Sequence, residues 1–154
     1  MSKIQKSVEV ERPVSTVYNQ WTQFESFPEF MEGVEQVQQM DDKRLHWKAK
    51  VGPSEREWDA EIVEQEPDRV IAWRAIGEVR NDGRVQFTPM GPDKTKVDVV
   101  FEMEPDGWVE KAGDALGVVD MRIQGDMERF KKFIESRGVE TGAWRGEVHG
   151  GQVQ

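Results

Sequence analysis

The spacing of apolar residues in the stretch 109–135 predicts one long amphipathic helix. Steps of three or four residues place a single stripe on one face, formed by Val109, Ala112, Leu116, Val119, Ile123, Met127, Phe130 and Ile134. Charged residues occupy the opposite face. Asp106 is a suitable N-cap, and Gly138 directly after Arg137 is a typical C-terminal stop signal.

Three glycines interrupt this helical pattern: Gly113, Gly117 and Gly125. A glycine inside a helix costs about 1 kcal/mol relative to alanine. Such a position is therefore expected where the helix is kinked, where another group packs closely against its backbone, or where it lies beside something other than ordinary core. The pattern leaves these interpretations open. Residues 119–135 read as a regular packed helix, and residues 108–117 as a mobile or kinked segment.

The rest of the chain alternates between apolar and polar residues, which predicts strands. The expected order is a strand, two short helices and a run of six strands before the long helix. The ranges are 4–11 for the first strand, 13–22 and 24–31 for the helices, and 34–40, 44–51, 55–65, 70–76, 85–89 and 96–104 for the strands. Because turns of two to five residues join these strands, they must be antiparallel. The fold class is therefore α+β.

Length and composition favour one compact domain at 1–137, followed by a glycine-rich and flexible tail at 138–154 in which Trp144 is a candidate anchor. The net charge is −9, which disfavours nucleic acid as a partner. Cysteine is absent, so disulfides and thiolate chemistry are excluded. No signal peptide or apolar run of membrane-spanning length is present, and we expect a cytoplasmic protein.

Candidate chemistry in the sequence is sparse, and we expect no catalytic residue, no metal site and no cofactor. His46 has the parity opposite to Trp47 and is expected to face solvent, while His149 lies in the glycine-rich tail. The carboxylates of the strand 55–65 are expected to form its solvated face. Arg56 lies two residues before Trp58, so its side chain points either to the same face as Trp58 or, at the strand edge, into solvent among surface glutamates.

Several segments along the chain, together with Val17 and Trp21, form a recognisable set. The segments are 8–14 (VEVERPV), 27–31 (FPEFM), 46–47 (HW), 57–62 (EWDAEI), 71–74 (IAWR), 83–87 (GRVQF) and 126–131 (DMERFK). In this order they resemble the polyketide cyclase/dehydrase and lipid-transport superfamily, also called START-like, SRPBCC or helix-grip proteins. The resemblance implies a curved antiparallel sheet of six or seven strands wrapped around the long C-terminal helix, with a ligand cavity between them.

On this resemblance, a set of large apolar residues is expected to line the cavity: Phe30, Trp47, Trp58, Ile62, Trp73, Phe87, Val99, Phe101, Leu116, Ile123 and Met127. Arg56, Gly113 and Gly117 are expected at its rim. The alternative is that the same rings simply fill the core.

The resemblance implies a binder of a hydrophobic small molecule such as a polyketide, an isoprenoid quinone or a lipid. The first alternative is an aromatase/cyclase-dehydrase acting on a poly-β-ketone, which would work largely by positioning its substrate. The second is a protein-interaction module that uses the acidic face or the tail. The sequence identifies neither the ligand nor the oligomeric state.

Overall fold

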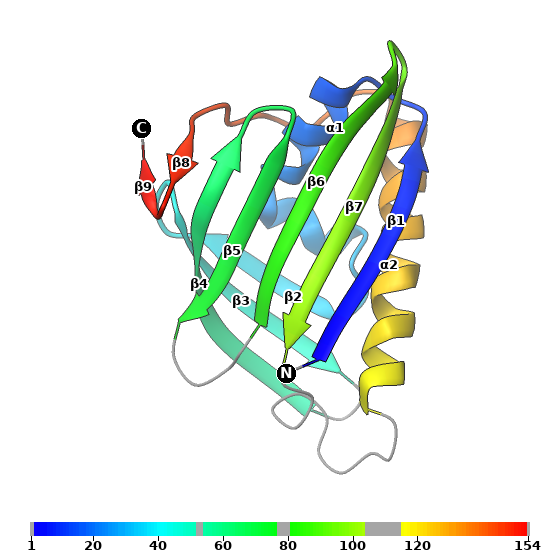
Figure 1. Ribbon diagram of the computed structural model, residues 1–154. Coiled ribbons are helices and arrows are strands. Elements are labelled where there is room, and N and C mark those ends of the chain that lie inside the picture. The colour runs from blue at the N-terminus through cyan, green and yellow to red at the C-terminus, as the bar shows by residue number, and fades with distance from the viewer. Residues whose placement is uncertain (1, 52–53, 77–80, 104–114, 154) are drawn as a thin grey trace.

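A computed structural model describes residues 2–51, 54–76, 81–103 and 115–153 (Figure 1). The helices in this part of the chain are α1 (Val14–Trp21), the 3₁₀ helix η1 (Phe24–Glu29) and α2 (Ala115–Arg137). The strands are β1 (Ser2–Val10), β2 (Val34–Gln39), β3 (Arg44–Val51), β4 (Ser54–Glu66), β5 (Val70–Ile76), β6 (Asn81–Gly91), β7 (Lys94–Met103), β8 (Val148–His149) and β9 (Gln152–Val153).

The strands form one antiparallel sheet with the order β1-β7-β6-β5-β4-β3-β2. The sheet is curved, and α1, η1 and α2 lie on its concave side (Figure 1). This arrangement confirms the predicted α+β helix-grip fold. None of the described helices is long and apolar enough to cross a membrane.

Helix α2 packs its predicted stripe against the sheet. Met127, Phe130 and Ile134 are buried and belong to the same apolar cluster as the inward-facing strand residues. The helix ends where the sequence indicates, because Gly138 adopts a φ of 81° and its N–H donates to the carbonyl of Ile134 at 2.8 Å. The expected N-cap Asp106 and residues 109–114 of the predicted helix lie outside the described residues.

Gly125 occupies a close-packing position in α2. A Cβ atom there would lie 3.1 Å from Nη1 of Arg129. The Arg129 guanidinium donates through Nε to the carbonyl of Phe30 at 3.0 Å and pairs with Asp126. The Asp126 carboxylate also accepts from the N–H of Glu32 at 3.0 Å. For this glycine the close-packing interpretation holds, since the space above it holds the arginine that ties α2 to the η1–β2 connection.

A bulge between Ile62 and Glu64 changes the direction of β4 side chains. Ile62 is buried on the concave side, and simple alternation would place Glu64 beside it. The extra residue shifts the alternation, so that Gln65 is buried and Glu64 and Glu66 are partly exposed. The carbonyl of the bulged Val63 accepts a hydrogen bond from Gly151 at 3.0 Å.

The C-terminal segment folds back onto the body, which the expectation of a flexible tail did not foresee. Thr141 and Gln20 exchange two hydrogen bonds, and the N–H of Trp144 donates to Oγ1 of Thr22 at 3.1 Å. Strand β8 then pairs with β4, and Val148 is fully buried. The sequence pattern missed this because β8 and β9 have two residues each, too few to show a period. The expected anchor Trp144 packs against the core.

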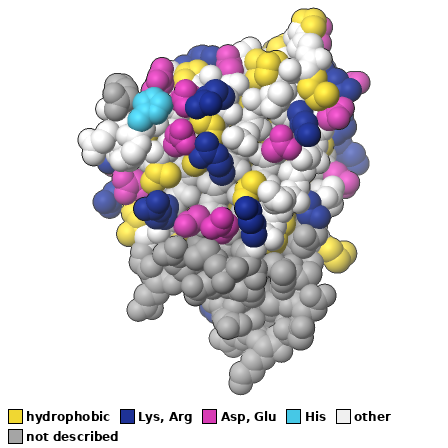
Figure 2. Space-filling view, in the orientation of Figure 1, with side chains coloured by type: hydrophobic (Ala, Val, Ile, Leu, Met, Phe, Trp, Pro, Cys, Tyr) yellow, Lys and Arg dark blue, Asp and Glu magenta, His cyan; other side chains and the backbone are white. Residues whose placement is uncertain are grey.

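The convex face of the sheet carries interspersed basic and acidic side chains (Figure 2). Arg84 on β6 pairs there with Glu64 on β4 at 2.8 Å, across the intervening β5. Lys43, directly before β3, pairs with Glu61 on β4 at 3.3 Å. His46 lies on the outer face of β3, as its parity predicts. Its Nδ1 is 2.7 Å from Asp59 and its Nε2 is 3.1 Å from Glu57. The hydrogen bonds with Asp59 and then Glu57 raise the pKa of His46 above its ordinary value.

We predict that replacing Val148 with Asp lowers the free energy of unfolding by about 2 kcal/mol or more, because a charge would be buried without a partner. Val148 is 0% exposed, whereas its cross-strand neighbour Val153 is 43% exposed. Val153→Asp is therefore the matched control and should have little effect. Urea unfolding of both variants measures the difference. Equal unfolding midpoints would show that β8 is not part of the folded core.

His46 should make stability depend on pH. A raised folded-state pKa means that its contribution is fully present below the ordinary value of 6.5 and is lost as the pH rises through the folded value. We expect His46→Gln to lower the urea midpoint at about pH 5 and to have much less effect at about pH 9. A variant equally destabilised at both values would contradict a role for the imidazolium.

Candidate functional site

Three indole rings form a wall on the concave face. Trp47 and Trp58 are cross-strand neighbours on β3 and β4, and their rings stack with centroids 5.9 Å apart and an interplanar angle of 5°. Trp73 reaches from β5 to Trp47, with centroids 6.2 Å apart and an angle of 25°. Each of the three residues is 6% exposed. We call these three residues the indole wall.

The position of Trp73 depends on Gly83. The two residues are paired across β5 and β6, and a Cβ atom on residue 83 would lie 2.6 Å from Cε2 of Trp73. The indole therefore lies directly against the backbone of β6. Glycine is required here because of this close approach. The sequence segment 83–87 thus has a physical reason for beginning with Gly.

The other residues expected along the cavity, apart from Leu116, lie in the same apolar cluster as the indole wall. Fully or nearly buried members are Phe30, Ile62, Phe87, Val99 and Met127, and partly buried members are Phe101 and Ile123. Phe30 packs against Phe130 with centroids 5.1 Å apart, which is a core contact between the η1–β2 connection and α2. The structure brings these side chains together, and their contact with a ligand stays a prediction.

The expected rim residues are only partly described. Arg56 pairs in register with Ala49 and is partly exposed, two residues before Trp58 on β4. Gly113 lies outside the described residues. Leu116 and Gly117 belong to the first turns of α2, where only the backbone is described.

Polar atoms within this apolar interior were missed by the sequence analysis. The indole Nε1 atoms of Trp47 and Trp21 are buried and have no hydrogen-bond partner among the described residues. A buried donor without an acceptor costs about 1–3 kcal/mol. Alternation identifies Trp47 as inward-facing, but it carries no information about where the indole N–H points.

A second polar group joins α1 and β4. Nε2 of Gln65 donates to the hydroxyl of Tyr18 at 3.0 Å, and both residues are fully buried. Burial raises the pKa of Tyr18 to about 12. The hydroxyl therefore keeps its proton at neutral pH and can act only as a neutral donor or acceptor. The bulge of β4 is what turns Gln65 inward, and no sequence signal marks it.

No carboxylate or imidazole belongs to the buried side chains of the described chain. Its buried polar side chains, apart from Tyr18 and the indoles, are Gln20, Thr22, Gln65 and Thr95. The histidines lie elsewhere, His46 on the outer face and His149 on β8. The described interior therefore presents an apolar surface with a few neutral hydrogen-bonding groups, and its buried side chains supply no carboxylate or imidazole for proton transfer.

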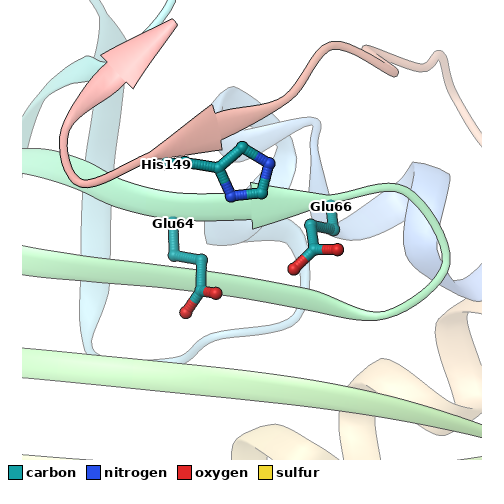
Figure 3. A group of neighbouring side chains, drawn as sticks. All are labelled: Glu64, Glu66 and His149. Atoms are coloured by element: carbon teal, nitrogen blue, oxygen red, sulfur yellow. The ribbon is translucent and has the colours of Figure 1, made fainter. Parts of the chain in front are cut away.

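One group of side chains on the outer face has the composition of a metal site, although the sequence analysis expected none. Glu64, Glu66 and His149 each offer a ligand atom, and these atoms lie within 4.8 Å of one another (Figure 3). Glu64 and Glu66 come from β4 and His149 from β8. The group is separate from the indole wall, since its carboxylates face away from the concave side.

We predict that Gly83→Ala destabilises the protein by about 1–3 kcal/mol, because the added Cβ displaces the Trp73 ring from β6. The same substitution in a Trp73→Leu background should cost much less, since the ring is then gone. Urea unfolding of the four proteins gives the coupling between the two positions. Additive effects would contradict direct contact as the cause.

Comparison with known proteins gives a consistent result. Residues 10–132 match the family described as polyketide cyclase/dehydrase and lipid transport. An uncharacterized 17.2 kDa protein of Streptomyces lincolnensis is 52% identical over 149 residues, which are 96% of this chain and 99% of that protein.

Two solved structures show the same fold. The Zhui aromatase/cyclase from Streptomyces sp. R1128 superposes with a TM-score of 0.74 at 16% identity, over 93% of this chain and 99% of that one. A START superfamily protein from Mycobacterium smegmatis gives a TM-score of 0.66 at 16% identity, over 88% and 95%. With its match over most of the length, the chain belongs to the polyketide cyclase/dehydrase and lipid transport family.

Proposed function

We propose that the chain binds an apolar small molecule between the concave face of its sheet and α2. The observation that carries this proposal is the indole wall, with the unpaired Nε1–H of Trp47 within it. Contact between flat aromatic rings and an apolar carbon skeleton contributes favourably to the free energy of binding. A ligand oxygen near Trp47 would satisfy a donor that the described residues leave without an acceptor.

The indole wall and the Trp47 N–H together favour a ligand with a largely apolar skeleton and at least one carbonyl or hydroxyl oxygen. A polyketide, an isoprenoid quinone and an oxygenated lipid all have this character. Ligand sites of this kind are mostly apolar, with a small number of polar groups that fix orientation. Arg56, on the same face of β4 as Trp58, is the proposed rim cation for a ligand carboxylate or phenolate. Gly113 and Gly117 are the proposed positions at the cavity mouth.

Cyclisation of a poly-β-ketone is the second candidate, favoured by the structural similarity to an aromatase/cyclase. In this chain it would work by positioning the substrate and polarising its carbonyls, with neutral donors such as Trp47 and Tyr18. Incubation with a reactive poly-β-ketone mimic tests this candidate. A product distribution identical to that without protein would exclude it and leave binding as the function.

Binding by the indole wall is testable with two flat probes, 9-fluorenone and fluorene, which differ by one carbonyl. We expect the wild type to bind fluorenone about 5–10-fold more tightly, because the carbonyl accepts the Trp47 N–H. Trp47→Phe keeps an aromatic ring and removes the donor, so the preference should disappear. Quenching of tryptophan fluorescence measures both affinities.

Trp73→Phe is the matched control, since it removes a neighbouring indole and leaves the Trp47 donor in place. It should retain the preference for fluorenone. If neither probe binds the wild type, the indole wall is ordinary core and the proposed function fails. If both bind equally well, an apolar site exists but Trp47 is not its polar anchor.

A further inference from the structure

We propose that Glu64, Glu66 and His149 bind a divalent transition-metal ion such as Zn²⁺, which fastens the C-terminal segment to β4. The site is on the outer face of the sheet and is independent of the proposed ligand cavity. Its donor set is one imidazole nitrogen and two carboxylate oxygens, which suits zinc better than magnesium or calcium.

The backbone brings the three residues together. The bulge after Ile62 turns Glu64 and Glu66 outward, and as residues two apart on β4 they share one face. The pairing of β8 with β4 then places His149 directly opposite Glu64. Figure 3 shows the imidazole above the strand that carries both carboxylates. Rotations of the partly exposed glutamate side chains are enough to draw the ligand atoms around one ion, since these atoms already lie within 4.8 Å of one another.

Each of the three side chains forms a hydrogen bond through one of its two polar atoms, so that the other atom can coordinate a metal ion. Nε2 of His149 lies 2.9 Å from Oε1 of Glu147, so a proton on Nε2 leaves the Nδ1 lone pair for the metal. Arg84 donates to Oε1 of Glu64 at 2.8 Å, and Arg69 pairs with Oε2 of Glu66. Among the described residues, these bonds occupy one oxygen of each carboxylate, and the second oxygen can coordinate the metal. Such outer partners commonly orient metal ligands.

His46 lies in surroundings that differ from those of His149 in one decisive way. It also lies on the outer face beside two carboxylates, but Asp59 contacts its Nδ1 and Glu57 contacts its Nε2. The two carboxylates therefore lie on opposite edges of the imidazole and cannot share one ion with it. At His149 both glutamates come from one strand, on one side of the ring. The proposed site therefore differs from the surroundings of His46 in the positions of its carboxylates, although both contain one histidine and two carboxylates.

The consequence of metal binding is a tighter attachment of the C-terminal segment. Strand β8 contributes only two residue pairs to β4. The segment is also held by Lys43, whose Nζ donates to the carbonyl of Gly151 at 2.7 Å. An ion bound by residues of both strands would add a cross-link between positions far apart in the sequence, which stabilises the folded state by binding it selectively.

Isothermal titration of the metal-free full chain with zinc chloride and with magnesium chloride tests the proposal. We expect one zinc ion per chain and much weaker binding of magnesium. His149→Gln should weaken zinc binding by more than tenfold, and Glu147→Gln by about tenfold to a hundredfold as an outer partner. His46→Gln is the matched control and should bind zinc as the wild type does.

Imidazole ¹H–¹⁵N spectra give a readout that does not depend on the variants. Zinc should shift the Nδ1 resonance of His149 and leave His46 unchanged. The proposal is overturned if the wild type binds no zinc at millimolar concentration, if His149→Gln binds as tightly as the wild type, or if the shifts fall on His46.

Discussion

The packing of α2 against the concave face of the sheet is the contact on which the rest of the structure depends. Met127, Phe130 and Ile134 are buried beneath the curved strands, and Phe30 joins them from the end of η1. Arg129 and Asp126 fix the same helix to the η1–β2 connection through charged hydrogen bonds. With the helix held in this way, the sheet must curve around it, and its inner face becomes a sheltered apolar surface.

The inner and outer faces of the sheet carry side chains of different chemical character. Inward positions of β3, β4 and β5 carry large rings, and outward positions carry interspersed charges. His46 and the carboxylates on the outward positions of β3 and β4 therefore lie outside, where they make ion pairs, and Glu64 and Glu66 hold a metal ion with His149 in the proposed site. Among the described residues, the fully buried polar side chains are neutral, and they include the Trp47 indole and the Tyr18–Gln65 pair. Such an interior favours recognition of an apolar molecule over proton-transfer chemistry.

Sequence periodicity predicts most of this fold because strands with one buried face alternate strictly. The ranges 44–51 and 70–76 coincide with β3 and β5, and the helix ends at Arg137 as Gly138 indicates. The same alternation rule explains which features the sequence prediction missed. The bulge in β4 breaks the alternation and turns Gln65 inward, and β8 and β9 are too short to have a period. The neighbours of His149 come from a strand far away in the sequence, so no local spacing reveals them.

Native mass spectrometry of the protein, purified without denaturation and with organic extraction of the same sample, tests the central claim most directly. The account predicts a co-purifying molecule that is largely apolar, carries at least one oxygen and leaves when Trp47 is replaced by Phe. A protein that is always free of ligand, whatever the host and the lipids or polyketides supplied, would contradict the account. The indole wall would then be a filled core.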